Sequence, residues 1–452
     1  MTENTIIYKY SLYSDKINGY TLVYNPLSTK GVIMLDKKAS ALLKLINNKR
    51  AIKEIYTLVR YQYDKVYKKN INSTIENFIS NEIAYIGSPV LKSIINTNRV
   101  LKVWFHITNK CNFRCKYCFL NKTSKYMGLE LAKKAVLKTI LDAKKHGFEK
   151  VFLVFAGGEP LLEFKKIVTL VEYGNLLSKK TGIAMRFNII TNGVLITKEV
   201  ANQIKKNDID VSISLDGLND YHNSQRIFVG GLGTFKFVER GILQLQQSGV
   251  KIHIGITITS NNIVHMPDLT RFLLKSDMYF SYNLFKETSC NKTQMEATND
   301  DLIKYLGKSL MIIYHNPPPF NVMNTLFDTI SFKQPKLTCS MGTSYITIKP
   351  DGQIASCPFI IERSIGSINE DIINTMQKGN FIKPSGLTVE GKNVCNKCQW
   401  KYICHGGCPI HTFQFKGTYA TNSPYCKAIK MILPLLLKIE GKRIITENKF
   451  IH

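Results

Sequence analysis

Three cysteines lie within eight residues of one another, as Cys111, Cys115 and Cys118 in the segment CNFRCKYC. Thiolates are the usual protein ligands of iron–sulfur clusters, and three of them can hold three irons of a [4Fe–4S] cluster while the fourth stays open to another ligand. Zinc is an alternative, but structural zinc normally takes four ligands, and His106 would have to supply the fourth. Three unrelated free cysteines would usually lack this spacing in a loop. The segment predicts a cluster with an open iron.

A second group of cysteines lies near the C-terminus. The chain has 11 cysteines, which in a chain without a secretory signal favour a metal or redox role over disulfides. Seven of them show a regular spacing: Cys339, Cys357, Cys395, Cys398, Cys404, Cys408 and Cys426. A zinc ribbon would explain only four of the seven. The sequence therefore predicts two separate metal-rich regions.

Alternating strands and helices must position the first group. Apolar runs typical of buried strands alternate with helical spacing between about residues 100 and 315. The expected strands are 101–107, 151–155, 185–190, 211–215, 251–257 and 279–285. Six β/α units predict an α/β fold, a partial (β/α)6 TIM-like barrel in which ligands gather at the C-terminal strand ends. Cys111 follows the first of these strands.

Further motifs follow the later strands in order. They are Gly157-Gly158-Glu159-Pro160, Thr191-Asn192-Gly193, the segment SISLDG at 212–217, and a loop that contains Arg226. Each alone is more often a simple turn at a strand end. Together with the cysteine triplet, they resemble the signature of the radical S-adenosylmethionine (SAM) superfamily.

That resemblance implies SAM and a [4Fe–4S] cluster as cofactors, with the cluster held by Cys111, Cys115 and Cys118 as the catalytic centre. The cofactor-binding residues that it implies are Tyr117 beside the adenine, Gly157, Gly158 and Glu159 at the methionyl amino group, and Ser214 and Arg226 as candidates for the ribose and carboxylate contacts. SAM would then yield a 5′-deoxyadenosyl radical that abstracts hydrogen from a substrate.

The C-terminal cysteines resemble the SPASM domain of peptide- and protein-modifying members of the superfamily. The resemblance implies one auxiliary [4Fe–4S] cluster on Cys395, Cys398, Cys404 and Cys426, and another on Cys339, Cys357 and Cys408, so that the chain would hold three clusters. The second set lacks a fourth cysteine. Its iron would be open to a substrate thiolate, or Cys290 or another ligand would close it.

Residues 1–90 are expected to form a separate module. Short strands at 6–10, 20–24 and 31–35 precede helical spacing, which is compatible with a winged-helix-like fold. The segments around Leu35-Asp36 and Arg50 resemble the peptide-recognition element of ribosomal-peptide maturation systems, which binds a leader peptide by strand addition. A packing role or DNA binding are the alternatives. The expected domains are 1–90, a barrel at 98–316 and a SPASM domain at 335–430.

Composition narrows the class of protein. The chain of 452 residues is 44% hydrophobic and carries a net charge of +28, with its lysines spread along its whole length. We interpret this charge as a solvated lysine-rich surface that suits an acidic peptide, and we expect no nucleic-acid partner. No apolar run is long enough for a membrane span, and no signal peptide is evident, so a cytoplasmic location is expected.

The leading functional hypothesis is a radical SAM peptide maturase of the sactipeptide or ranthipeptide type, which joins a cysteine sulfur to a carbon of a precursor peptide. An electron donor such as flavodoxin or ferredoxin would be a second partner. Alternatives within the class are an enzyme that forms carbon–carbon or carbon–oxygen cross-links, and a sulfatase-maturing enzyme. Outside the class, the chain could be an iron–sulfur redox sensor that binds DNA.

Overall fold

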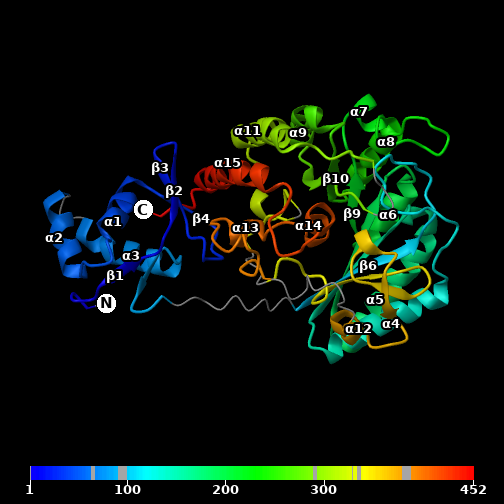
Figure 1. The fold of residues 1–452 in the computed structure, drawn as a ribbon, viewed down its shortest axis with the longest axis horizontal. Helices are drawn as coiled ribbons and strands as arrows, with labels where there is room; N and C mark the ends of the chain where they lie inside the picture. Colours follow the sequence, from blue (N-terminus) through cyan, green and yellow to red (C-terminus); the bar gives the residue numbers. More distant parts are fainter. Residues whose placement is uncertain are drawn as a thin grey trace.

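The computed structural model describes residues 2–62, 67–89, 99–288, 293–327, 329–332, 337–378 and 388–451. Cys290 lies outside these ranges. Figure 1 shows the N-terminal elements at one end of the molecule and the central sheet with its helices at the other, with the C-terminal helix between them.

A nine-stranded sheet forms the centre, in the order β11-β10-β9-β8-β7-β6-β12-β13-β14. The strands from β6 to β11 pair in parallel. They are β6 (Val100–Thr108), β7 (Lys150–Gly157), β8 (Ala184–Thr191), β9 (Asp210–Ser214), β10 (Ile252–Ile258) and β11 (Tyr279–Leu284). The predicted α/β class is therefore confirmed, and all six strands lie within one or two residues of their predicted positions.

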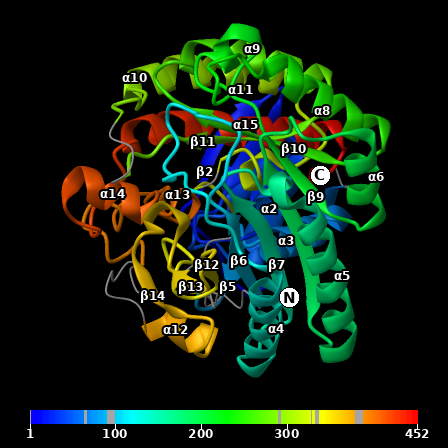
Figure 2. The same ribbon diagram turned by 90° about the vertical axis from the view of Figure 1, so that its right-hand side faces the viewer.

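Alternation along each strand separates a helix-covered face from an open one. In β10, Ile252, Ile254, Ile256 and Ile258 are buried, while the intervening His253, Gly255 and Thr257 line a central cavity. Helices cover the outer face of the curved sheet (Figure 2). They include α4 (Leu129–Lys145), α5 (Phe164–Thr181), α6 (Lys198–Lys206), α8 (Phe235–Gln247), α9 (Met266–Lys275) and α11 (Gly307–His315). The short helices α7 (Asn219–Asn223) and α10 (Asn299–Asp301) lie in the segments that follow β9 and β11.

Three strands from the cysteine-rich C-terminal segment extend this sheet. They are β12 (Tyr345–Ile348), β13 (Gln353–Ala355) and β14 (Ser364–Ser367). β12 and β13 pair antiparallel and form a hairpin around Pro350-Asp351-Gly352. The sequence did not predict that β12 also pairs in parallel with β6, with Thr347 opposite Trp104. This pairing places the segment around Cys357 beside the strand that precedes Cys111.

The N-terminal elements form two small sheets and three helices. Strands β2 (Tyr13–Ile17), β3 (Tyr20–Tyr24) and β4 (Val32–Leu35) make an antiparallel sheet, and β1 (Ile7–Lys9) pairs with β5 (Ala84–Ile86). The helices are α1 (Lys37–Leu45), α2 (Ile52–Gln62) and α3 (Tyr67–Ser80). The expected strand at 6–10 therefore belongs to a different sheet. The N-terminal three-stranded sheet takes β2 as its third strand instead. The sequence of β2, YSDKI, is partly polar, so its apolar content does not indicate a strand.

The C-terminal helix connects the two ends of the molecule. After α12 (Ile372–Lys378), α13 (Lys401–Cys404) and α14 (Pro409–Lys416), the chain forms α15 (Cys426–Thr446). Gly441 of α15 packs so closely that a Cβ atom there would lie 2.8 Å from Met34 Sδ and 2.9 Å from Ile17 Cδ1. Lys438 of the same helix forms an ion pair with Asp15. In the parts of the chain that the structure describes, no helix has the length and apolar character required to cross a membrane.

Candidate functional site

A cavity of about 200 Å³ lies at the C-terminal ends of the parallel strands, and it brings the predicted residues of the first site together. Its lining includes all nine of them: Cys111, Cys115, Tyr117, Cys118, Gly157, Gly158, Glu159, Ser214 and Arg226. These residues come from four separate segments of the chain. The parallel sheet therefore brings together motifs that lie far apart in the sequence.

Two glycines let the end of β7 approach the cysteine loop. The Gly158 N–H donates to Thr108 O at 2.7 Å, and the Glu159 N–H donates to Lys110 O at 2.8 Å. A Cβ atom on Gly158 would lie 2.0 Å from Lys110 O, and one on Gly157, where φ is +142°, would lie 2.2 Å from Thr108 O. Both glycines are therefore required by close backbone contact with the start of the cysteine loop.

Substitution of Gly158 by alanine tests this contact. The added Cβ must displace the backbone beside Cys111, and a shift of about 1 Å in a catalytic arrangement can reduce the rate about 100-fold. We expect Gly158→Ala to lower SAM cleavage by about that factor, measured as 5′-deoxyadenosine release. Gly128→Ala is the matched control, because no atom lies within 4 Å of a Cβ at that position. Equal rates for the two variants would contradict the prediction.

Glu159 is fully engaged within the protein. Its Oε1 accepts hydrogen bonds from Leu161 N at 2.9 Å and Thr191 Oγ1 at 2.6 Å, and its Oε2 accepts one from Asn192 N at 2.8 Å. Burial raises the pKa of this carboxyl, and these three hydrogen bonds oppose that effect. The carboxylate therefore joins the ends of β7 and β8 and shapes the wall of the cavity.

A buried ion pair supports the opposite wall. Asp216 Oδ2 accepts a hydrogen bond from Arg226 Nε at 2.6 Å and another from the Tyr117 hydroxyl. Asp216 Oδ1 accepts one from Thr257 N at 2.8 Å. Burial lowers the pKa of Arg226, but the negative charges around it, Asp216 first among them, outweigh burial. The pKa of Arg226 therefore lies well above its usual value. The guanidinium carbon lies 5.2 Å from the centre of the Tyr117 ring.

Asp216 is the functional residue that the sequence reasoning missed. It is completely buried and connects Tyr117 and Arg226, the two predicted residues, to β10. The available signal was its place in SISLDG, next to the strand end that already supplied Ser214. A carboxylate so placed needs a buried cation, and Arg226 is the nearby cationic residue of the motif that follows.

Two thiols of this site, those of Cys111 and Cys115, are partly buried and have raised pKa values. Burial raises the pKa of Cys111 to about 12 and that of Cys115 to about 11. Arg226 Nη1 lies 3.8 Å from Cys115 Sγ. Metal binding deprotonates such thiols, and a nearby cation favours the thiolate form. Among the residues with described positions, no three His, Cys, Asp or Glu side chains are close enough to share a single metal ion, whereas the thiolates of a cubane bind separate irons.

A larger cavity of about 800 Å³ fills the barrel beneath this site. The two cavities share Tyr117, Ser214 and Thr257 in their linings. The C-terminal segment also contributes to the larger one, through Tyr345 and Phe359. A molecule in the barrel would therefore touch both the cysteine loop and the segment that carries Cys357.

The set Cys339, Cys357 and Cys408 is brought together at this side of the barrel. Burial raises the pKa of Cys339 to about 11, and it raises that of Cys357 even more strongly. The charge of Cys408 raises both pKa values further. Phe359, two residues beyond Cys357, lies 4.9 Å from Phe119, the residue after Cys118, measured between ring centres. Residues next to both cysteine groups, Phe119 after Cys118 and Phe359 near Cys357, therefore line the same larger cavity.

The remaining set also meets at one place. Cys395, Cys398, Cys404 and Cys426 line a small pocket between α13 and the start of α15. Lys392 is fully buried nearby, and its Nζ donates to Gly406 O at 3.0 Å. Burial lowers the pKa of this ammonium group, and the negative charges of Cys395, Cys404, Cys408 and Cys339 oppose that effect. Lys392 therefore lies between the two C-terminal sets, a position for which the sequence analysis had assigned no role.

Known proteins resemble the chain in the region of this site. Residues 105–273 match the family described as the Radical SAM superfamily. A cysteine-type anaerobic sulfatase-maturating enzyme of Clostridium perfringens is 27% identical over 352 residues, 71% of this chain and 91% of that protein. The radical SAM cyclopropyl synthase TigE of Paramaledivibacter caminithermalis is 23% identical and covers 84% of each chain.

Two solved structures share the fold. Native anSMEcpe with bound AdoMet and Cp18Cys peptide has a TM-score of 0.61 and 22% identity, and it covers 76% of this chain and 99% of its own. Streptococcus suis SuiB bound to precursor peptide SuiA has a TM-score of 0.54 and 17% identity, and it covers 92% of this chain and 98% of its own.

Proposed function

Because residues 105–273 form a radical SAM domain and the chain is accordingly an enzyme that uses SAM, we propose that it installs a thioether cross-link in a ribosomally made precursor peptide. The observation that carries this proposal is the shared cavity. Tyr117 and Phe119 of the cysteine loop after β6 line the same barrel interior as Pro358 and Phe359, which directly follow Cys357 of the incomplete set. We abandon the alternative of a DNA-binding redox sensor, because such a sensor has no use for SAM-binding segments.

The residues of the first site fit a cluster and SAM. We infer that Cys111, Cys115 and Cys118 hold a [4Fe–4S] cluster, since the three thiols surround one cavity and a guanidinium lies beside Cys115. Gly157 and Gly158 line the same cavity. Because these glycines carry no side chains of their own, they leave room for a methionyl group. When bound there, SAM and the reduced cluster supply a 5′-deoxyadenosyl radical that abstracts hydrogen.

The protein's own residues orient and shield that chemistry. Arg226, held by Asp216, presents its positive charge in the cavity, where the SAM carboxylate would be bound. Tyr117 is almost fully buried and packs against Phe285, at 6.4 Å between ring centres, and its ring forms part of the lining of both cavities. Burial of these groups keeps water away from the reacting atoms.

The C-terminal sets are proposed as auxiliary cluster sites, which would raise the total to three clusters. Cys395, Cys398, Cys404 and Cys426 provide four thiols. Cys339, Cys357 and Cys408 provide three, and no fourth cysteine joins them within the described ranges. An open iron beside the barrel cavity would bind a substrate cysteine and bring its sulfur close to the carbon from which hydrogen is removed. The step would balance because the carbon gives one hydrogen atom to the 5′-deoxyadenosyl radical, the thiol gives its proton to solvent, and the remaining electron passes to the auxiliary cluster as the carbon–sulfur bond forms.

The N-terminal module is proposed to bind the leader segment of the precursor. We infer domains at 1–90, 98–316 and 335–430. The small antiparallel sheet β2-β3-β4 provides an edge at β2 to which an extended peptide could add, whereas Ile451 already pairs with Leu35 at the β4 edge. The similarity to SuiB, which was solved with a precursor peptide, covers 92% of this chain, whereas the similarity to anSMEcpe covers 76%. The wider coverage favours a precursor peptide over a folded sulfatase as the substrate.

Sulfatase maturation is the second candidate, because the relative with 27% identity matures sulfatases. The experiment that separates the candidates incubates the reconstituted protein with SAM, dithionite and either a cysteine-rich precursor with its leader or a cysteine-type sulfatase peptide. We expect 5′-deoxyadenosine in both reactions and loss of two hydrogens from the precursor alone. Modification of the sulfatase peptide alone would favour the second candidate, and a cross-link in a precursor without cysteine would indicate carbon–carbon or carbon–oxygen bond formation.

The incomplete set gives a prediction of its own. With Cys339→Ala and Cys357→Ala together, SAM cleavage should continue within about threefold, because the radical site keeps its three ligands, while cross-linking should fall at least about 100-fold for want of a positioned sulfur. Both rates are measured in one reaction, from 5′-deoxyadenosine and from the mass of the peptide. Loss of both activities together would show that these cysteines serve mainly to hold the fold.

A further inference from the structure

A surface loop covers the outside of the cysteine loop. The segment between α7 and α8 forms a short hairpin, in which Ile227 pairs with Gly233 around Gly230-Gly231. The Arg114 N–H donates to Ile227 O at 2.8 Å, and the Val229 N–H donates to Asn112 O at 3.1 Å. The hairpin is therefore hydrogen-bonded to the residues directly between Cys111 and Cys115.

The tip of this hairpin is apolar and exposed. Val229 is 58% exposed, Leu232 is 71% exposed and Phe237, in the first turn of α8, is 41% exposed. We call these three side chains, with the exposed Arg114, Lys116 and Lys236 around them, the 229–237 face. Single exposed apolar residues are ordinary, but three close together with no role in the core mark a contact surface.

A line of aromatic rings connects this face to the cysteine loop. Phe237 lies 5.2 Å from Phe228, and Phe228 lies 5.2 Å from the fully buried Phe113, measured between ring centres. Phe113 is the second residue after Cys111, and its N–H lies 3.4 Å from Cys111 Sγ. The Arg114 guanidinium donates to Cys111 O and Phe113 O at 3.0 and 2.9 Å. The face is therefore the nearest surface that contacts the loop through packed side chains and hydrogen bonds.

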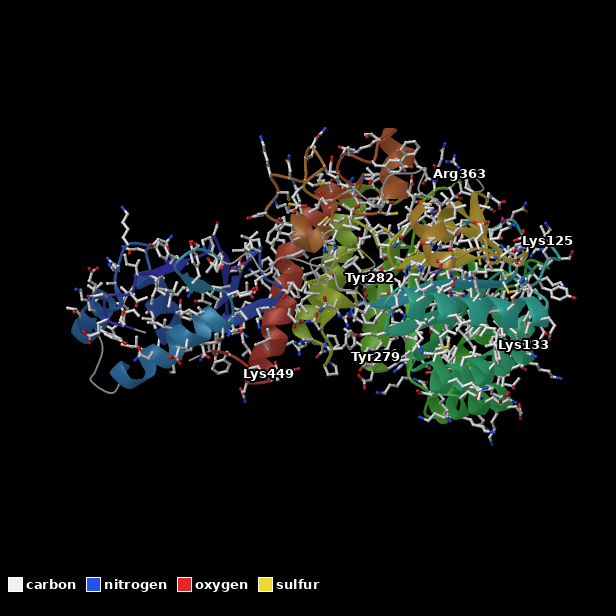
Figure 3. All side chains as sticks on the ribbon, turned by 90° about the horizontal axis from the view of Figure 1, so that it is seen from below. Lys125, Lys133, Tyr279, Tyr282, Arg363 and Lys449 are labelled. Atoms are coloured by element: carbon white, nitrogen blue, oxygen red, sulfur yellow. The ribbon has the colours of Figure 1, made fainter. Side chains whose placement is uncertain are left out.

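Cations predominate around the face. Residues 109–128 and 221–238 contain no Asp or Glu. Exposed cations in these segments are Lys110, Arg114, Lys116, Lys125 and Lys236, and the exposed acids Glu130, Asp220 and Glu239 lie one or two residues outside them. Figure 3 shows Lys125 at the end of the molecule opposite the N-terminal elements, away from the module proposed to bind the leader. A basic rim around an apolar centre suits an acidic protein, since complementary charge steers association.

We propose that the 229–237 face is the docking surface for a small acidic electron-transfer protein that reduces the cluster on Cys111, Cys115 and Cys118. The proposal rests on the ligation proposed above. One electron leaves the carrier's reduced flavin or [2Fe–2S] centre and enters the oxidised cluster, so the carrier is oxidised by one electron and the cluster reduced by one. The apolar tip disfavours nucleic acid as the partner, because it offers no contact to phosphates.

The test compares two reductants. Leu232→Ser with Lys236→Glu removes the most exposed apolar side chain and reverses one charge, and neither side chain contacts the cavity. With dithionite, SAM cleavage should stay within about twofold of the parent. With a reduced acidic flavodoxin or ferredoxin, the carrier concentration at half-maximal rate should rise about tenfold, and added salt should weaken the parent enzyme's reaction more than the variant's.

The matched control is Leu176→Ser with Lys180→Glu, an exposed leucine and lysine on α5, which should leave both reactions unchanged. An unchanged carrier concentration dependence in the face variant, with normal dithionite activity, would overturn the docking surface. So would a raised requirement for the precursor peptide in the dithionite reaction, since the face would then bind substrate. Absence of 5′-deoxyadenosine from the parent with dithionite would instead remove the proposed function, so the two failures are distinguishable.

Discussion

Replacing Cys115 with alanine is expected to abolish 5′-deoxyadenosine formation, with a fall of at least about 1,000-fold. Cys115 is the middle ligand of the proposed triplet and is held beside the Arg226 guanidinium. With two thiolates left, the cluster loses a corner and with it the geometry of the open iron. Apart from Cys111 and Cys118, the one soft side chain in residues 109–128 is Met127, which is fully buried in the hydrophobic core and does not replace the lost sulfur.

Iron analysis distinguishes loss of the cluster from loss of the fold. Reconstituted parent protein should contain about 12 irons per chain if three cubanes form, and Cys115→Ala should contain about 4 fewer. Cys404→Ala is the comparison, because it should lower iron by a similar amount at the C-terminal set while SAM is still cleaved. Full iron content in Cys115→Ala, or cleavage at the parent rate, would show that another group is the true ligand.

The sequence predicted the barrel well because its signals are local. Alternating isoleucines in β10 and the helical spacing of the apolar residues that follow it depend only on neighbouring residues, so strand and helix positions follow from spacing. The cavity residues followed because the C-terminal ends of parallel strands must meet at one edge of a sheet. Gly158 shows the limit of this reasoning, since the 2.0 Å approach to Lys110 O that requires a glycine is visible only in three dimensions.

What the sequence could not predict depends on contacts between distant segments. The pairing of β12 with β6 joins residues about 240 positions apart, and no local pattern specifies it. In the N-terminal module, β2 carries Ser14 and Lys16 among its five residues, so its strand character comes from pairing with β3 rather than from apolar content. The position of Lys392 between two cysteine sets is likewise a result of tertiary packing alone.

The buried carboxylate of Asp216 gives the second large effect. Asp216→Asn keeps the shape of the side chain but removes the negative charge that faces Arg226 Nε at 2.6 Å, so a fully buried guanidinium loses its counterion. Removal of one partner from a buried ion pair costs about 3–5 kcal/mol. We expect the melting temperature to fall by roughly 10 °C. We also expect the SAM concentration at half-maximal rate to rise at least about tenfold, since Arg226 is no longer held in place.

Two further variants separate stability from SAM binding. Asp210→Asn, at the start of the strand β9 that precedes Asp216, breaks an ion pair with Arg186 in which both side chains are about half exposed, and this should cost less than about 1 kcal/mol. In the double variant Asp216→Asn with Arg226→Met no unpaired charge stays buried, so at least half of the lost thermal stability should return. SAM affinity should not return, because the cation itself is gone. Recovery of both properties would mean that Arg226 serves only to neutralise Asp216, and that the SAM carboxylate is bound by another residue of the cavity.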